Sequence, residues 1–159
     1  MKVIGSTSQF AMHFGESTDQ LRTVEVWVQG KSITPFDSSA YVPGFSAALA
    51  RSENALKKDL NFLRYESLFL GLSVEEAFLK LAEASSPHLE QAWLSLRFAD
   101  WGPTTDDFLC FLIPVGGRLY LACQELSTQA VHAAQITPDD LLRVLEGARH
   151  ELSACSKAS

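Results

Sequence analysis

Apolar and polar residues alternate with a period of two near the start of the chain, which predicts strands. The alternation covers residues 10–14 and 24–28, after a short first strand at residues 3–4. Gln29 and Gly30 can form a two-residue turn that pairs Val28 with Lys31. Pro35 and the polar residues 37–39 then end the returning strand.

Helical spacing replaces this alternation after Pro43 and Gly44. Ser73 and Glu76 form a capping box, which predicts that a second, short helix starts there. Residues 85–87 (Ser-Ser-Pro) are expected to end that helix. The predicted apolar stripe of the first helix consists of Phe45, Leu49, Leu56, Leu60 and Leu63.

A period of two returns from Glu90, so Trp93, Leu94, Leu96 and Phe98 are expected in a strand. Residues 101–107 read as a loop. The clearest hairpin follows, with strands at residues 108–115 and 118–125 joined by Gly116 and Gly117, which tolerate the positive φ of a tight turn. This turn places Cys110 opposite Cys123. Both faces of the hairpin are apolar, which predicts a place at the sheet centre.

A last helix is expected to begin at Thr137 as N-cap, with Pro138 in its first turn, and residues 153–159 are expected to fray. Strands in hairpins, not alternating with helices, indicate an α+β fold. The sequence therefore predicts one α+β domain over residues 1–159, with a mostly antiparallel sheet and about three helices packed against it.

Composition predicts a cytoplasmic protein. The residues are 47% hydrophobic and 20% charged, as in globular domains. No apolar signal segment follows Lys2, and no apolar run is long enough to span a membrane. The three cysteines lack metal-ligand spacing, so free thiols in a reducing compartment are expected.

The net charge of −6 is concentrated in one part of the chain. Residues 66–107 contain eight acidic residues against only Lys80 and Arg97, while acids and bases balance elsewhere. Such a field repels nucleic acids and anionic membranes and attracts a basic partner. The alternative is that the charge serves solubility alone.

No motif for nucleotide binding, zinc hydrolysis or serine catalysis is present, and we expect no cofactor, no metal and no catalytic residue. The four histidines are scattered along the chain. A Cys110–His132 pair is a conceivable nucleophile, but nothing local would activate the thiol.

The loop around Trp101 is the candidate partner-binding site. Tryptophan is a frequent interface anchor, and an acidic rim would steer a basic partner. The alternative is that Trp101 packs inward and the aspartates only solvate the loop. The predicted partner-binding residues are Asp100, Trp101, Asp106, Asp107 and Glu90.

Three segments resemble the immunity-protein-42 family of bacterial polymorphic-toxin and contact-dependent inhibition loci: Ile4-Gly5 with Ser8-Gln9-Phe10-Ala11, residues 24–31 (VEVWVQGK) and residues 111–119 (FLIPVGGRL). The helical region 38–89 has no counterpart in this resemblance. The resemblance implies a non-enzymatic protein that binds and neutralises a cognate toxin domain, such as a nuclease. A secretion chaperone and an enzyme of unfamiliar type are the alternatives.

Overall fold

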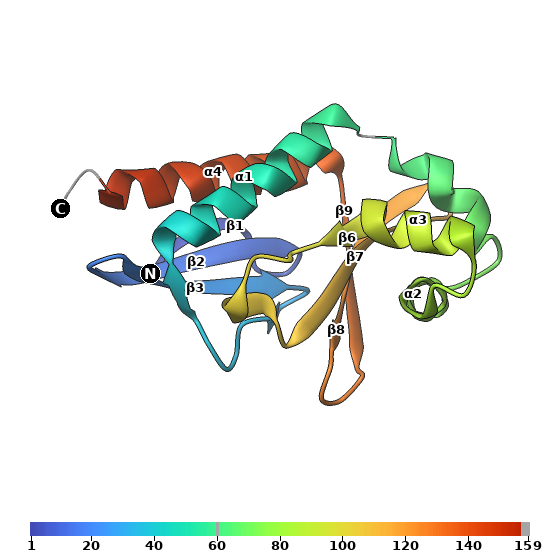
Figure 1. Ribbon diagram of the computed structural model, residues 1–159, viewed down its shortest axis with the longest axis horizontal. Helices are drawn as coiled ribbons and strands as arrows, with labels where there is room; N and C mark the ends of the chain where they lie inside the picture. Colours follow the sequence, from blue (N-terminus) through green and yellow to red (C-terminus); the bar gives the residue numbers. More distant parts are fainter. Residues whose placement is uncertain (60, 157–159) are drawn as a thin grey trace.

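Two antiparallel sheets form the frame of the computed structural model, which describes residues 1–59 and 61–156 (Figure 1). The α+β class is as predicted. However, the strands divide into two sheets instead of the single sheet expected. The first sheet has the order β1 (Lys2–Ser6), β2 (Phe10–Thr18), β3 (Leu21–Val28), β4 (Lys31–Ser32), and β5 (Ser39–Tyr41) also pairs with β3. The second has the order β6 (Arg97–Phe98), β7 (Phe108–Val115), β8 (Arg118–Glu125), β9 (Val131–Ile136).

The hairpins follow the predicted register. Val28 pairs with Lys31 across the first tight turn. Cys110 pairs with Cys123 across the turn at Gly116 and Gly117, whose φ angles are 62° and 74°. β7 and β8 are the two inner strands of their sheet, and β7 is buried on both faces. The expectation of a central hairpin is therefore confirmed.

More helices cover the sheets than the three predicted. α1 (Val42–Lys58) and α4 (Pro138–Ser156) lie side by side, with α4 on β1 and β2 (Figure 1). The 3-10 helix η1 (Phe62–Phe69), α2 (Val74–Glu83) and α3 (Pro87–Leu96) pack against β7 of the second sheet. None of the helices in the described part of the chain combines the length and apolar character of a membrane span.

Three predictions for single segments need correction. Residues 87–96 form α3 instead of a strand, because Ser86 caps the helix and its buried residues recur at helical spacing. Leu63 is half exposed on η1 and does not extend the stripe of α1, while Leu60 lies outside the described residues. Residues 153–156 continue α4, whereas 157–159 lie outside the described residues.

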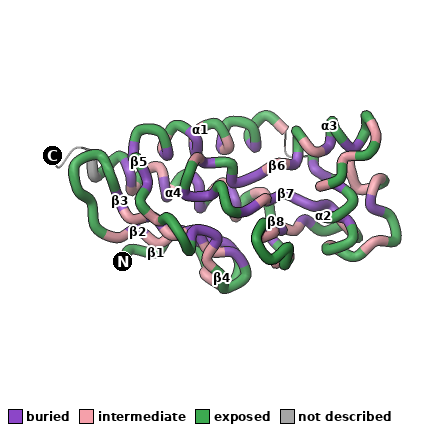
Figure 2. Tube along the Cα trace, turned by 60° about the horizontal axis from the view of Figure 1, so that its bottom comes forward, coloured by how far each residue is buried: buried purple, intermediate pink, exposed green. Residues whose placement is uncertain are grey.

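One continuous hydrophobic core connects the two sheets (Figure 2). β3 contacts both β8 and β9. The Phe10 ring of the first sheet meets the Phe98 ring of the second edge to face, with ring centroids 5.8 Å apart. Ile4 of β1 lies on the same face of the first sheet as Phe10, and Gly147 lets α4 approach it there, since a Cβ at Gly147 would lie 2.8 Å from Ile4 Cγ2.

Two glutamates form ion pairs that connect the long helices α1 and α4 to neighbouring segments. Glu53 on α1 is 3% exposed and accepts hydrogen bonds from Lys57 (2.8 Å) and from Arg149 on α4. Burial raises the pKa of Glu53, but the hydrogen bonds from Lys57 and Arg149 outweigh it, so the net pKa is lowered. Hydrogen bonds from Lys2 and Arg22 lower the pKa of Glu151 on α4.

These two lowered pKa values make the stability dependent on pH. The native protein binds fewer protons than the unfolded chain near the ordinary glutamate pKa of 4.5, so the stabilisation is present above that pH and lost as the pH falls. We expect the free energy of unfolding to drop between about pH 6 and about pH 3, and the variant Glu53→Gln/Glu151→Gln to drop less steeply. Urea unfolding at several pH values in this range measures the free energy of unfolding, with the variant Glu16→Gln, at an exposed position, as control. Parallel pH curves for the double variant and the parent would contradict the assignment.

The cysteine pair should be unreactive in the folded protein. Cys110 and Cys123 are both 0% exposed and have free thiols. Burial, together with the hydrogen bond to Cys110, raises the pKa of the Cys123 thiol well above its usual range. Since the thiolate is the reactive form, we expect alkylation of both by iodoacetamide to be at least about ten-fold slower in the native protein than in denaturant. Peptide mass spectrometry measures each rate, and equal rates would place the pair outside the core.

Candidate functional site

α2 presents acidic residues on the side opposite to its buried face. Ala77, Phe78 and Leu81 are fully buried against the second sheet, so Glu75 and Glu83 point to solvent. The predicted capping box is present: Ser73 Oγ accepts from the Glu76 backbone N–H (3.1 Å), and the Glu76 carboxylate accepts from the Ser73 N–H (3.4 Å).

α3 adds Glu90 in its first turn, where a carboxylate is stabilised by the helix dipole. Glu90 is exposed, and Leu94, one turn later on the same side of the helix, is 75% exposed. The sequence predicted both residues in a strand, so their position on the same side of a helix was not anticipated. The Ser86-Pro87 start and the Glu90 that follows were the signal that could have revealed the helix.

The loop between β6 and β7 sends its tryptophan inward and its aspartates outward. Ala99 and Gly102 take positive φ angles of 58° and 94°, and the 3-10 helix η2 (Pro103–Thr105) follows. Thr105 Oγ1, buried in this turn, accepts the Trp101 N–H at 3.0 Å. The loop is therefore a packed turn, and the side chains of Asp100, Asp106 and Asp107 are exposed.

The expectation that Trp101 anchors a partner on the surface is wrong. Its side chain is only 2% exposed. The indole packs against the rings of Phe10, Phe45 and Phe98, with centroids 5.3–6.3 Å apart, and its Nε1–H donates to Ser52 Oγ at 2.9 Å. Trp101 is thus a core residue that joins the two sheets to α1, which was the alternative reading of the sequence.

We group seven exposed carboxylates of residues 66–107, from α2, α3 and the β6–β7 loop, under the name acidic surface. Within the described ranges 1–59 and 61–156, none of the seven forms an ion pair, in contrast to Glu53 and Glu151. The eighth acid, Glu66, is half-buried and accepts the Gly117 N–H of the β7–β8 turn at 2.8 Å, so it serves the fold. The members of the acidic surface, all exposed, are Glu75, Glu76, Glu83, Glu90, Asp100, Asp106 and Asp107.

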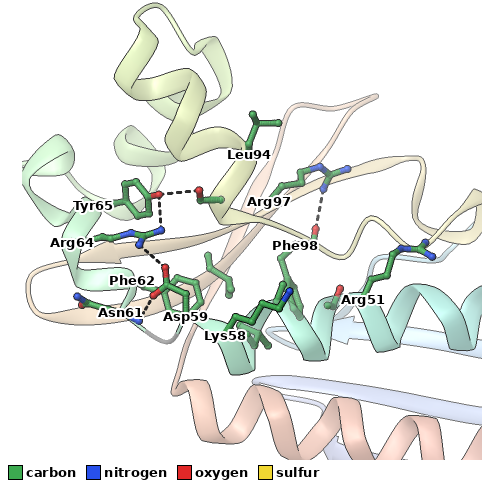
Figure 3. A pocket seen from close by; sticks show the side chains of 15 residues that line it. Arg51, Lys58, Asp59, Asn61, Phe62, Arg64, Tyr65, Leu94, Arg97 and Phe98 are labelled. Carbon is green, nitrogen blue, oxygen red and sulfur yellow. Dashed lines mark hydrogen bonds and ion pairs between the residues drawn. The ribbon is translucent and has the colours of Figure 1, made fainter.

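A cavity of about 420 Å³ lies between α1, η1 and the end of α3 (Figure 3). Four cationic side chains from three segments line it, against a single carboxylate, Asp59. The sequence did not reveal this site, because its basic residues are far apart along the chain and a charge count by segment does not group them. The cations are Arg51, Lys58, Arg64 and Arg97.

The second sheet places a thiol opposite a histidine. Cys123, not Cys110, is the direct cross-strand partner of His132. Burial, then the positive charge of Lys31, lowers the pKa of His132, while burial raises that of the Cys123 thiol. Both shifts favour the neutral forms of the two side chains. No cluster of three or more metal-ligating His, Cys, Asp or Glu side chains occurs in residues 1–59 and 61–156.

Comparison of the chain with protein-family models, with curated proteins and with solved structures found no match.

Proposed function

We propose that this chain is an immunity protein that binds a basic toxin domain through the acidic surface. The observation that carries the proposal is the presence of seven exposed carboxylates with no ion pair in the described structure. Carboxylates without a cationic partner are not neutralised within the protein, so their field attracts a basic protein over a distance of about 8 Å at physiological salt. The resemblance of the three segments to the immunity-protein-42 family supports the same proposal.

Inhibition would follow from charge mimicry. A nuclease holds its substrate with Lys and Arg side chains that neutralise phosphates. A surface of carboxylates offers the same cations a competing set of anions, and the bulk of the bound protein excludes the nucleic acid. This mechanism needs no catalytic group on the inhibitor.

Exposed leucines replace Trp101 as the apolar part of the proposed interface. Interfaces combine an apolar centre with a polar rim. Leu94 on α3 and Leu79 on α2 are 75% and 44% exposed, and each is on a helix that carries members of the acidic surface. Burying Leu94 would contribute about 1.5–3 kcal/mol to binding.

Co-expression with the protein encoded immediately upstream tests the proposal. We expect this chain to co-purify with that protein and to restore the growth of cells that produce it. The Leu94→Asp variant should lose both effects while remaining folded, since Leu94 is already exposed. Val3→Asp, at a 47% exposed valine on β1 of the first sheet, is the control and should behave like the parent. Absence of both co-purification and protection for the parent chain would refute the proposal.

A further inference from the structure

The cationic cavity is built by segments that are distant in sequence. Arg51 and Lys58 project from α1 two turns apart, on one side of the helix, while Arg64 comes from η1 and Arg97 from the start of β6 (Figure 3). The volume of about 420 Å³ is within the range of about 300–1,000 Å³ that small-molecule sites occupy. The cavity therefore has the size of a ligand site.

The charges in the cavity are only partly compensated. Arg64 pairs with Asp59 at 2.5 Å and also donates to the Tyr65 hydroxyl. Arg51 and Lys58 form no ion pair or hydrogen bond within the described part of the chain. The cationic side chains that line the cavity repel one another, because they carry like charges. A bound anion would relieve this repulsion.

Arg97 is held in position by the backbone. Its Nη1 donates to the carbonyl oxygens of Phe98 (2.9 Å) and Cys110 (3.3 Å), and its guanidinium lies 5.9 Å from the centre of the Trp93 ring. This anchoring leaves the remaining guanidinium N–H groups as donors. A guanidinium fixed in this way matches the oxygen geometry of a phosphoryl group with little further loss of side-chain entropy.

Most of the remaining wall of the cavity is apolar or aromatic, with Ser52, Asn61 and Ser95 as its uncharged polar members. Phe62, Phe98 and Leu112 are buried residues that reach it, and Tyr65 borders it with its hydroxyl donating to Ser95 Oγ at 2.9 Å. Such a wall offers an apolar contact surface to a flat ring. The site thus combines separate regions for an anionic group and for an apolar body.

We infer that this cavity binds an organic phosphate of the size of a mononucleotide. The phosphoryl group lies among the cations, with Lys58 and Arg51 as its main partners, and the flat body packs against the aromatic wall. We expect a long polyanion to bind less well, because the exposed Glu90 and Asp100 are near in sequence to the lining residues Leu94 and Phe98 and would repel it. The inference does not rest on the proposed toxin binding, although Leu94 lines the cavity and is also part of the proposed interface.

Calorimetric titration at low salt tests this inference with three probes: AMP, adenosine and inorganic phosphate. We expect AMP to bind at least about ten-fold more tightly than either adenosine or phosphate, since only AMP fills both regions. The variant Arg51→Gln/Lys58→Gln should weaken AMP binding by about ten-fold or more, because two charge-assisted contacts are lost. Lys31→Gln/Arg118→Gln removes the same charge from exposed positions outside the cavity and should leave binding within about two-fold of the parent.

Three results would overturn the inference. The first is the absence of heat with AMP, and the second is equal affinity for AMP and inorganic phosphate, which would indicate an unspecific cationic patch. The third is an equal loss of AMP affinity in both double variants, which would indicate an effect of net charge alone. Since Arg51 and Lys58 are exposed and unpaired in the described structure, their glutamine variants should fold, and thermal unfolding checks this.

Discussion

Replacing Trp101 with alanine is expected to lower the free energy of unfolding by about 3–5 kcal/mol. The indole is 2% exposed and fills the space between three aromatic rings from β2, α1 and β6. Its removal leaves a cavity where the two sheets and α1 meet, and it also leaves Ser52 Oγ without its donor. Urea unfolding followed by far-UV circular dichroism measures the loss.

Two further variants make this result interpretable. Trp101→Phe keeps most of the ring packing and should cost about 1–2 kcal/mol, so it remains measurable if the alanine variant does not fold. Trp27→Ala is the matched control, since Trp27 is only half-buried and stacks on His13, and it should cost less than Trp101→Ala. A cost below about 1 kcal/mol for Trp101→Ala would show that the indole is not a core side chain.

The sequence was most informative where local geometry decides the structure. In β3 the buried positions alternate as predicted, because a strand with one covered face must bury every second residue. The Gly116-Gly117 turn determined the register down to the Cys110–Cys123 pair, since two residues with positive φ leave a single pairing.

The sequence failed where non-local packing decides the structure. Residues 131–136 (VHAAQI) have little strand propensity, yet they form β9 because β8 offers them an unpaired edge. The pattern of residues 93–98 matched a strand, but the Ser86-Pro87 cap and the burial of Leu89, Ala92 and Leu96 made residues 87–96 a helix. Short apolar runs leave this choice open, and tertiary contacts decide it.

The charge of the candidate site could be predicted from the sequence, but the directions of its side chains could not. Counting charges located the acidic segment, because net charge can be summed without knowing the fold. The direction of Trp101 could not be found in this way, since it depends on the positive φ of Ala99 and on rings that are up to 91 residues away, as Phe10 is. The cationic cavity was missed for the same reason.

Neutralising the three loop aspartates is expected to slow association with the toxin by about ten-fold at low salt. The variant Asp100→Asn/Asp106→Asn/Asp107→Asn keeps the size of each side chain and removes three of the exposed carboxylates without an ion pair in the described structure. Because they are exposed, these groups act mainly on the rate of encounter, while the dissociation rate should change little. Stopped-flow or surface-based kinetics at several salt concentrations would measure both rates.

A second triple variant distinguishes the acidic surface from net charge. Glu16→Gln/Asp19→Asn/Asp139→Asn also removes three exposed negative charges from the total of −6, but on β2, on the β2–β3 turn and on α4. Asn is suited to position 19, whose φ is 53°. If the loop contributes to the binding surface, only the loop variant should lose the rate enhancement at low salt, and the difference should shrink as salt screens the field. Equal slowing by both variants would assign the effect to total charge, and no slowing by either would exclude the loop from the path of association.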